Sequence, residues 1–155
     1  MLEPSCLSVF RDELLRLFPD DARAADLATR AMTLSGHLTA RDVAPRRRLR
    51  HGLLHRHCHD KSLAAASGER AWMERCFETL EEPESGCCGM AGTYGMRERT
   101  RAIGQTLFGR RLKPAIEEAG EDTVVVANGF SCTEQIGDGT AQRTLHPVEV
   151  IERCL

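Results

Sequence analysis

The chain has 155 residues and a nearly balanced charge, with 21 Lys and Arg against 23 Asp and Glu and a formal net charge of −2. This length suits one domain, and the balance gives no general attraction to nucleic acid or to an anionic membrane, so we predict neither partner. No stretch approaches the ~18 apolar residues of a membrane span, and the N-terminus lacks a signal-peptide core. We therefore expect a cytoplasmic protein whose seven cysteines are reduced thiols serving as ligands or redox groups.

The first third of the chain predicts two helices followed by a polar connection. Within residues 8–21, SVFRDELLRLFPDD, apolar side chains recur at helical spacing before Pro19, namely Phe10, Leu14, Leu17 and Phe18. A second helix is capped by Asp20 or Asp21 and ends at Gly36, with Ala24, Leu27, Ala31 and Leu34 on its apolar side. Residues 37–48 are predicted to be an arginine-rich connection.

Three consecutive arginines, Arg46 to Arg48, lie in that connection. A nucleic-acid patch would need interleaved aromatic side chains to stack bases, and this segment has none. We therefore predict a solvated loop or a docking surface there. Because no GxGxxG fingerprint follows a predicted strand, we predict no nucleotide site.

The remaining two thirds alternate strands and helices. Residues 48–58 predict a strand weakened by Gly52, residues 69–80 a helix, and residues 96–119 a helical region interrupted near Gly109 and Pro114. Residues 123–127, TVVVA, predict a strand buried on both faces of a parallel sheet, and residues 145–154 a helix with Pro147 in its first turn. This order predicts an α/β, Rossmann-like single domain, with a small, mostly parallel sheet flanked by helices.

Four cysteines are predicted to meet at one edge of this sheet. Cys58 follows the first strand and Cys132 follows the strand at 123–127. The carboxyl ends of parallel strands converge, so these two thiols should lie close together. Cys87 and Cys88 lie between them in a glycine-rich loop, GCCGMAGTYG, which we expect to lead into a helix whose N-terminal N–H groups stabilise thiolates.

Several interpretations of Cys87 and Cys88 are open: buried apolar thiols, a vicinal disulfide, or ligands of a metal or cluster. Buried thiols rarely sit in a glycine-rich loop, and a vicinal bridge strains the backbone, so we favour ligation. One tetrahedral zinc ion accommodates adjacent cysteines poorly, whereas a multi-iron cluster offers separate irons. Glycines such as Gly86 and Gly89 let backbone N–H groups approach a bound group closely.

The histidines and remaining cysteines carry weaker signals. His55, His57 and His59 alternate as on a strand and could form a set of metal ligands. We favour a supporting role in which His57 and His59 flank Cys58 and hydrogen-bond a thiolate or the backbone. Cys76 and Cys154 are predicted to be structural. Cys6 is left undecided between a ligand and a free thiol.

The segments HRHCHDKSL, GCCGMAGTYG, NGFSCTEQI and LHPVEVI, in this order, resemble the cysteine-rich CCG domain family. That family occurs in heterodisulfide reductase B subunits, in glycolate oxidase iron-sulfur subunits and in FAD-linked D-2-hydroxyacid dehydrogenases, whose C-terminal iron-sulfur part is the most similar. The resemblance implies a [4Fe-4S] cluster, or zinc in some copies. It places the metal ligands at Cys58, Cys87, Cys88 and Cys132. Around the cofactor we predict His57, His59, Gly86, Gly89 and Gln135.

Two departures from the family pattern qualify the resemblance. Gln135 stands where the fullest pattern has a further cysteine. The preceding repeat is missing, with residues 1–47 as a candidate remnant, and so is a flavin domain. The resemblance therefore implies an iron-sulfur electron-transfer module of a flavin-linked 2-hydroxyacid oxidoreductase. We expect this module to be inactive alone and to bind a flavoprotein or a second copy of itself. We assign no catalytic residue. The alternatives are a structural zinc module for assembly and thiol–disulfide redox chemistry through Cys87 and Cys88.

Overall fold

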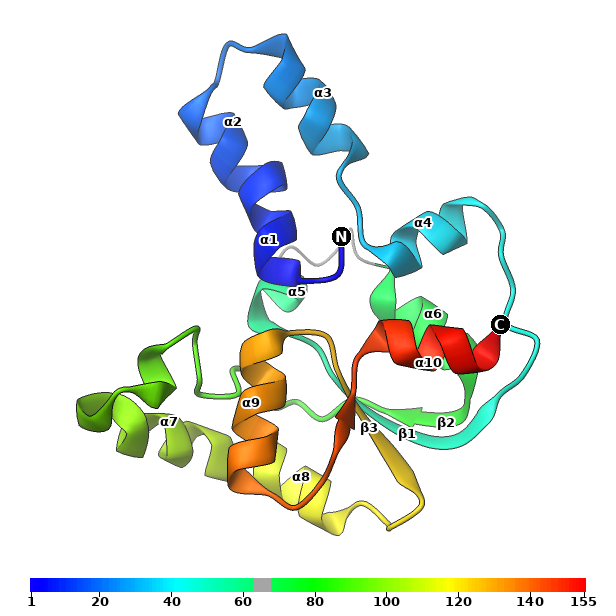
Figure 1. Ribbon diagram of the computed structural model, residues 1–155, viewed down its shortest axis with the longest axis vertical. Helices are drawn as coiled ribbons and strands as arrows, with labels where there is room; N and C mark the ends of the chain where they lie inside the picture. Colours follow the sequence, from blue (N-terminus) through cyan, green and yellow to red (C-terminus); the bar gives the residue numbers. More distant parts are fainter. Residues whose placement is uncertain (63–67) are drawn as a thin grey trace.

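The computed structural model describes residues 1–62 and 68–155, and its body is an α/β layer structure around one parallel sheet (Figure 1). The sheet contains β1 (Leu49–His55), β2 (Phe77–Glu81), β3 (Thr123–Ala127) and β4 (Thr144–Leu145) in the order β2-β1-β3-β4, with every pair parallel. The predicted fold class is therefore confirmed. The two central strands run side by side over their full overlap and end together, since His55 pairs with Ala127.

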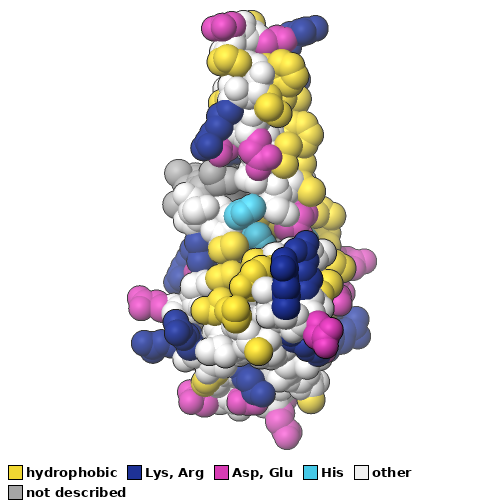
Figure 2. All heavy atoms as spheres, turned by 90° about the vertical axis from the view of Figure 1, so that its left-hand side faces the viewer, with side chains coloured by type: hydrophobic (Ala, Val, Ile, Leu, Met, Phe, Trp, Pro, Cys, Tyr) yellow, Lys and Arg dark blue, Asp and Glu magenta, His cyan; other side chains and the backbone are white. Residues whose placement is uncertain are grey.

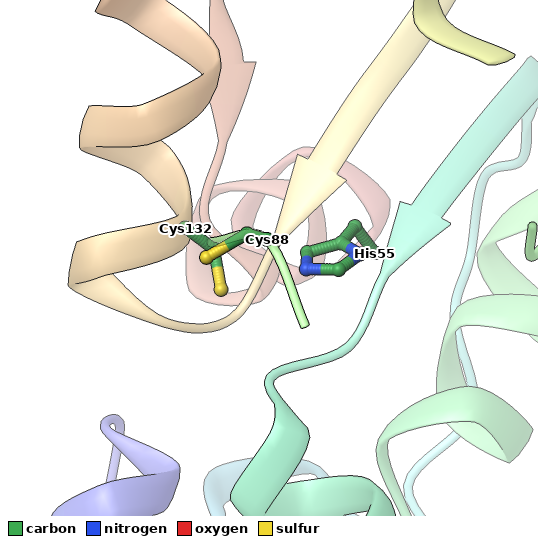
Figure 3. Close-up of side chains that lie close together, drawn as sticks. All are labelled: His55, Cys88 and Cys132. Atoms are coloured by element: carbon green, nitrogen blue, oxygen red, sulfur yellow. The ribbon is translucent and has the colours of Figure 1, made fainter. Parts of the chain in front are cut away.

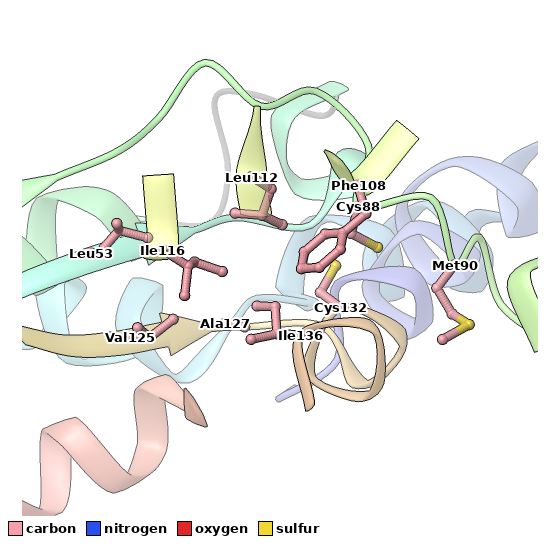
Figure 4. Packing of buried hydrophobic residues seen from close by; sticks show 10 residues of the cluster. All are labelled: Leu53, Cys88, Met90, Phe108, Leu112, Ile116, Val125, Ala127, Cys132 and Ile136. Atoms are coloured by element: carbon pink, nitrogen blue, oxygen red, sulfur yellow. The ribbon is translucent and has the colours of Figure 1, made fainter. Parts of the chain in front are cut away.

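Helices cover both faces of the sheet because neighbouring residues of the central strands point in opposite directions. Leu53 and Val125 pack with Phe108 of α7 (Glu98–Arg110), with α8 (Leu112–Glu118) and with α9 (Phe130–Gly139), as Figure 4 shows. On the opposite face, Leu54 and Val126 pack against α6 (Glu69–Cys76) and α10 (Pro147–Cys154). The Val-rich β3 is therefore buried on both faces, as predicted.

An arm of helices projects from this body (Figure 1). The arm, residues 4–30, consists of α1 (Pro4–Ser8), the π-helical η1 (Val9–Glu13), α2 (Leu14–Leu17) and, after a turn, α3 (Ala22–Arg30). Asp21 caps α3 by accepting a hydrogen bond from the Arg23 backbone N–H, as predicted. The short elements α4 (Leu34–Ala40), α5 (Cys58–Ser62) and the 3₁₀ turn η2 (Tyr94–Met96) complete the described structure. None of its helices is long and apolar enough to cross a membrane.

Three local predictions were wrong, and two elements were not predicted. The second helix ends at Arg30, and Gly36 lies inside the separate helix α4 because Thr33 caps a new start by accepting from the Gly36 N–H. The helix predicted over 69–80 ends at Cys76, where the chain turns into β2 and pairs with β1. The strand β4 and the helix α9 were not predicted. The glycine-rich loop also does not lead directly into a helix, since α7 begins only at Glu98.

Gly52 has a packing reason in the middle of β1. A Cβ atom built there would lie 2.8 Å from the Phe77 ring and 2.9 Å from a Leu80 methyl group, both on β2. Any larger residue would push these side chains apart. The glycine that weakened the strand prediction therefore permits the close packing of the first strand pair.

Candidate metal centre

The candidate centre lies where the sheet changes its direction of winding. From β1 the chain continues to β2 on one side, whereas from β3 it continues to β4 on the other. In open α/β sheets, ligands bind outside the carboxyl ends of the strands that flank such a switch point. His55 ends β1, Ala127 ends β3, and the segments that follow them carry Cys58 and Cys132.

Three buried side chains from different segments converge there: His55 of β1, Cys88 of the glycine-rich loop and Cys132 in the first turn of α9. Their ligand atoms all lie within 4.8 Å of one another. Figure 3 shows the imidazole ring of His55 opposite the two sulfur atoms. His55 is 0% exposed and the two thiols are at most 3% exposed. The fold thus brings together two of the predicted ligands with a histidine that we had not selected.

The thiols of Cys58 and Cys87 lie next to this group and nearer to the surface. Interaction with the Cys132 thiol is the main reason that the pKa of Cys88 is raised to about 11. Interaction with the Cys88 thiol is the main reason that the pKa of Cys87 is raised. The pKa of Cys58 is raised mainly by burial and, to a smaller extent, by the neighbouring Cys87. The four thiols are therefore successive neighbours in the order Cys58, Cys87, Cys88, Cys132, with the first two partly exposed.

The glycine-rich loop holds this arrangement through backbone conformations that side chains disfavour. Gly86 and Gly89 have φ angles of 61° and 92°. A Cβ atom on Gly89 would lie 2.2 Å from the carbonyl oxygen of Gly104 in α7, so the loop lies directly against that helix. The Gly89 N–H donates to the Cys87 sulfur over 3.4 Å, which helps to satisfy this thiol.

The turn after β1 is fixed by buried polar contacts. Asn128, at the end of β3, accepts a hydrogen bond from the His57 N–H at 2.7 Å and donates to Asp60 of α5 at 3.1 Å. Arg56 forms ion pairs with Asp60 and with Glu82, which follows β2. These contacts connect the ends of three strands and set the position of Cys58.

His57 and His59 lie beside Cys58 but do not enter the group of ligand atoms within 4.8 Å. The His57 ring is buried against Gly129, where a Cβ atom would lie 2.4 Å from the ring, and its Nδ1 accepts from the His59 N–H at 3.2 Å. That nitrogen also lies 4.0 Å from the Cys58 sulfur. The exposed His59 faces Ser8 of α1, with Nδ1 and Oγ 3.4 Å apart.

The remaining cysteines lie apart from this group. Cys76 and Cys154 are fully buried in the core on the opposite face of the sheet, and the Cys154 thiol contacts the Cys76 carbonyl oxygen at 3.8 Å. Cys6 is exposed on α1. Glu3, at the start of that helix, accepts a hydrogen bond from the Phe130 N–H at 2.8 Å and so joins the arm to α9 beside Cys132.

The lone pair of the buried His55 Nε2 indicates that the donor set fits a metal, whereas the buried Gln135 Nε2 is an amide nitrogen that can only donate a hydrogen bond. His55 Nε2 and Gln135 Nε2 are buried without a hydrogen-bond partner in the described residues, and Gln135 is 1% exposed. Buried polar atoms are rarely left unsatisfied, so each such atom calls for an explanation. A soft cation bound by the thiolates would also receive the His55 lone pair and would offset the cost of placing neighbouring thiolates in a buried site.

His55 and its neighbour Ser85 were the main residues that sequence analysis missed. The Ser85 hydroxyl lies 2.9 Å from His55 Nδ1, in a segment where we had predicted no element. His55 had been considered only as one of three alternating histidines. The usable signal was its position as the last strand residue before Cys58, because such residues lie at the sheet edge where parallel strands end.

Comparison with known proteins finds similarity to one domain family and to two dehydrogenases. Residues 62–137 match the model of the family described as "CCG: Cysteine-rich domain". The chain is 34% identical over 98 residues to D-2-hydroxyglutarate dehydrogenase of Pseudomonas putida, covering 61% of this chain and 9% of that protein. It is 38% identical over 76 residues to a subunit of the anaerobic glycerol-3-phosphate dehydrogenase of Escherichia coli, covering 46% of this chain and 18% of that one.

The chain thus spans less than a fifth of the length of these relatives. No solved structure is significantly similar to it. The matched family segment begins in α5 and includes Cys87, Cys88 and Cys132. The resemblance inferred from the sequence is confirmed, since residues 62–137 match the model of the CCG cysteine-rich domain.

Proposed function

We propose that the chain is the iron-sulfur electron-transfer module of a flavin-linked 2-hydroxyacid oxidoreductase. The observation that supports this most directly is the row of four neighbouring thiols at the switch point of the sheet. Four cysteine thiolates are the usual ligands of a [4Fe-4S] cluster. The two relatives are named as dehydrogenases or dehydrogenase subunits, which favours a redox role.

When bound, such a cluster would accept and donate single electrons. Cys58, Cys87, Cys88 and Cys132 would hold it, Gly86 and Gly89 would keep the loop close to it, and Gln135, His57 and His59 would lie around it. The apolar packing of Cys88 and Cys132 beside Phe108 keeps water from the inner side (Figure 4). The partly exposed Cys58 and Cys87 leave an outer side through which a partner could exchange electrons.

The same proposal assigns hydride removal to a partner. Oxidation of a hydroxyacid requires an organic cofactor such as a flavin, and the sequence carries no nucleotide-binding fingerprint. A flavoprotein subunit or domain would oxidise the substrate and pass electrons to this module. The isolated chain is therefore expected to show no 2-hydroxyacid dehydrogenase turnover.

Metal analysis tests the proposal. Protein produced with ample iron and without oxygen should be brown and contain iron with acid-labile sulfide. Serine at Cys58, Cys87, Cys88 or Cys132 should remove most of the iron, because each change deletes a soft ligand. The matched controls Cys76→Ser and Cys154→Ser should keep it, since both thiols lie on the far face of the sheet. Equal iron loss in all six variants would indicate misfolding and contradict the ligand assignment.

A structural zinc ion is the second candidate. Zn–S bonds of about 2.3 Å and Zn–N bonds of about 2.0 Å place the ligand atoms of a tetrahedral ion less than ~4 Å apart. His55, Cys88 and Cys132, within 4.8 Å, would need to close only slightly around one ion. A colourless protein with stoichiometric zinc after anaerobic preparation would favour this candidate. Thiol–disulfide exchange is less well supported, because the raised pKa of Cys87 and Cys88 disfavours the nucleophilic thiolate.

A further inference from the structure

The strongest unexplained feature of the site is the histidine that closes it from the sheet side. His55 is the last residue of β1 and is fully buried. Its ring has two nitrogen atoms with different surroundings. Nδ1 lies 2.9 Å from the Ser85 hydroxyl oxygen, whereas Nε2 has no hydrogen-bond partner in the part of the chain that the structure describes.

The His55 ring faces the thiols, and we assign the facing nitrogen as Nε2 because Nδ1 is paired with Ser85. The ligand atoms of His55, Cys88 and Cys132 are mutually within 4.8 Å, and Figure 3 shows the ring edge directed toward both sulfurs. The Ser85 hydroxyl provides an acceptor for a proton on Nδ1. In that tautomer the Nε2 lone pair points to the sulfurs and is free to bind a cation.

This arrangement matches the way proteins orient ligating histidines. A metal-bound imidazole almost always donates its other N–H to an oxygen atom, which fixes both the tautomer and the ring direction. Here Ser85, on the segment that leads into the glycine-rich loop, would have that role. The packing around β1 leaves the ring no exposed position to move into, since its residue is 0% exposed.

We propose that His55 Nε2 is a direct ligand of one metal ion of the centre, beside Cys88 and Cys132, and that Ser85 orients it. This proposal shares one premise with the proposed function, namely that the site binds a metal. In an iron-sulfur cluster held by the four cysteines, the neutral imidazole would be an additional ligand of one iron. In a zinc site the same nitrogen would complete a mixed histidine and cysteine set.

The closing experiment uses Co²⁺ as the probe, titrated without oxygen into the metal-free full-length chain and followed by visible absorption. The wild type should bind Co²⁺, and His55→Leu should lose most of that binding. Ser85→Ala should weaken binding by roughly 10–100-fold, as expected when an orienting partner is removed. His51→Gln is the matched control, because His51 lies on the same strand but bonds Thr79 away from the site, and it should bind like the wild type.

A second readout separates ligation from folding. His55→Cys restores a soft donor and should recover Co²⁺ binding, with stronger sulfur-to-metal charge-transfer absorption than the wild type. If the protein also takes up iron and sulfide, wild type labelled with ¹⁵N-histidine should show nitrogen coupling in pulsed electron paramagnetic resonance, and His55→Cys should not.

The outcomes distinguish this proposal from the proposed function. Co²⁺ binding that depends on His55, together with failed iron-sulfur assembly, would support His55 as a metal ligand and contradict the electron-transfer role. Unchanged Co²⁺ binding in His55→Leu, or an iron-sulfur centre without nitrogen coupling, would overturn the ligand while leaving that role intact. A chain that binds neither metal would overturn both.

Discussion

At the scale of single residues, the candidate centre depends on positions where the backbone approaches another segment closely. Gly89 and Gly129 show this most clearly, since a Cβ atom on either would lie within 2.4 Å of Gly104 or of the His57 ring. Gly89 directly follows the predicted ligand Cys88, and Gly129 packs on His57, which directly precedes the predicted ligand Cys58. Because these two positions have no side chain, the chain segments that carry the candidate ligands can pack closely against their neighbours.

Gly89→Ala is predicted to be strongly destabilising. Alanine at a φ of 92° is strained, and its Cβ would lie 2.2 Å from the Gly104 carbonyl oxygen, which cannot rotate away. We expect a loss of at least about 2–3 kcal/mol in the free energy of unfolding. The control Gly92→Ala, at a φ of 65° with nothing near its Cβ, should cost only about 1 kcal/mol. Equal losses in denaturant unfolding of the two variants would contradict the close approach.

At the scale of elements, sequence patterns predicted the central strands well and the peripheral ones poorly. β3 was predictable because Val124, Val125 and Val126 form a short apolar run typical of a strand covered on both faces. β2 was mistaken for the end of a helix, since Phe77 and Leu80 also continue the helical spacing of α6, and only pairing with β1 decides between the two. β4 has two residues, too few for a periodic signal.

The same reasoning explains how much of the site could be predicted. The parallel-strand rule led us to expect Cys58 and Cys132 at one edge, and the structure places them in one group with Cys87 and Cys88. The role of His55 could not be predicted, because strand alternation gives the face of a residue but not which nitrogen atom lacks a partner. That depends on Ser85, which is thirty positions away in the sequence.

Helix α6 also contains a buried carboxyl group that should make stability depend on pH. Burial raises the pKa of Glu69 from 4.5 to about 7; the charge of Asp60 adds to this, while the Ser35 hydrogen bond, Arg56 and the N-terminal amine oppose it. The folded state thus favours protonated Glu69. Its stabilising effect is complete below pH 4.5 and is lost as the pH rises through about 7, by roughly 3 kcal/mol.

Glu69→Gln should therefore flatten the pH dependence of the free energy of unfolding between pH 5 and 8 and make the protein more stable than the wild type at pH 8. Denaturant unfolding at several pH values measures this. Glu74→Gln is the control, because Glu74 lies on the same helix with a half-exposed side chain and should leave the slope unchanged. Parallel curves for wild type and Glu69→Gln would show that this carboxyl group does not cause the dependence.

At the scale of the whole molecule, the arm presents a surface unlike that of the body. Hydrophobic side chains run along one edge of the projecting arm (Figure 2). Its exposed apolar residues are Val9, Leu15, Leu17, Phe18 and Leu27. Phe10 and Leu14, two of the apolar positions of the first predicted helix, are partly buried. We retain as a proposal that residues 1–47 are the remnant of a preceding repeat, since the relatives are several times longer than this chain.

The exposed edge of the arm predicts association. Leu17 and Phe18, at the tip of α2, are 72% and 53% exposed, and contiguous apolar surface of this kind marks interaction sites. In the absence of a flavoprotein, we expect the isolated chain to associate with itself through the arm, seen as a concentration-dependent mass in sedimentation velocity.

The double variant Leu17→Glu with Phe18→Glu should shift the protein to the monomer, because two charges would have to be buried at the contact. Ile103→Glu, at a 49% exposed position on α7 in the body, is the control and should associate like the wild type. A wild type that stays monomeric at every concentration and does not bind a flavoprotein would show that the arm is not an interaction surface.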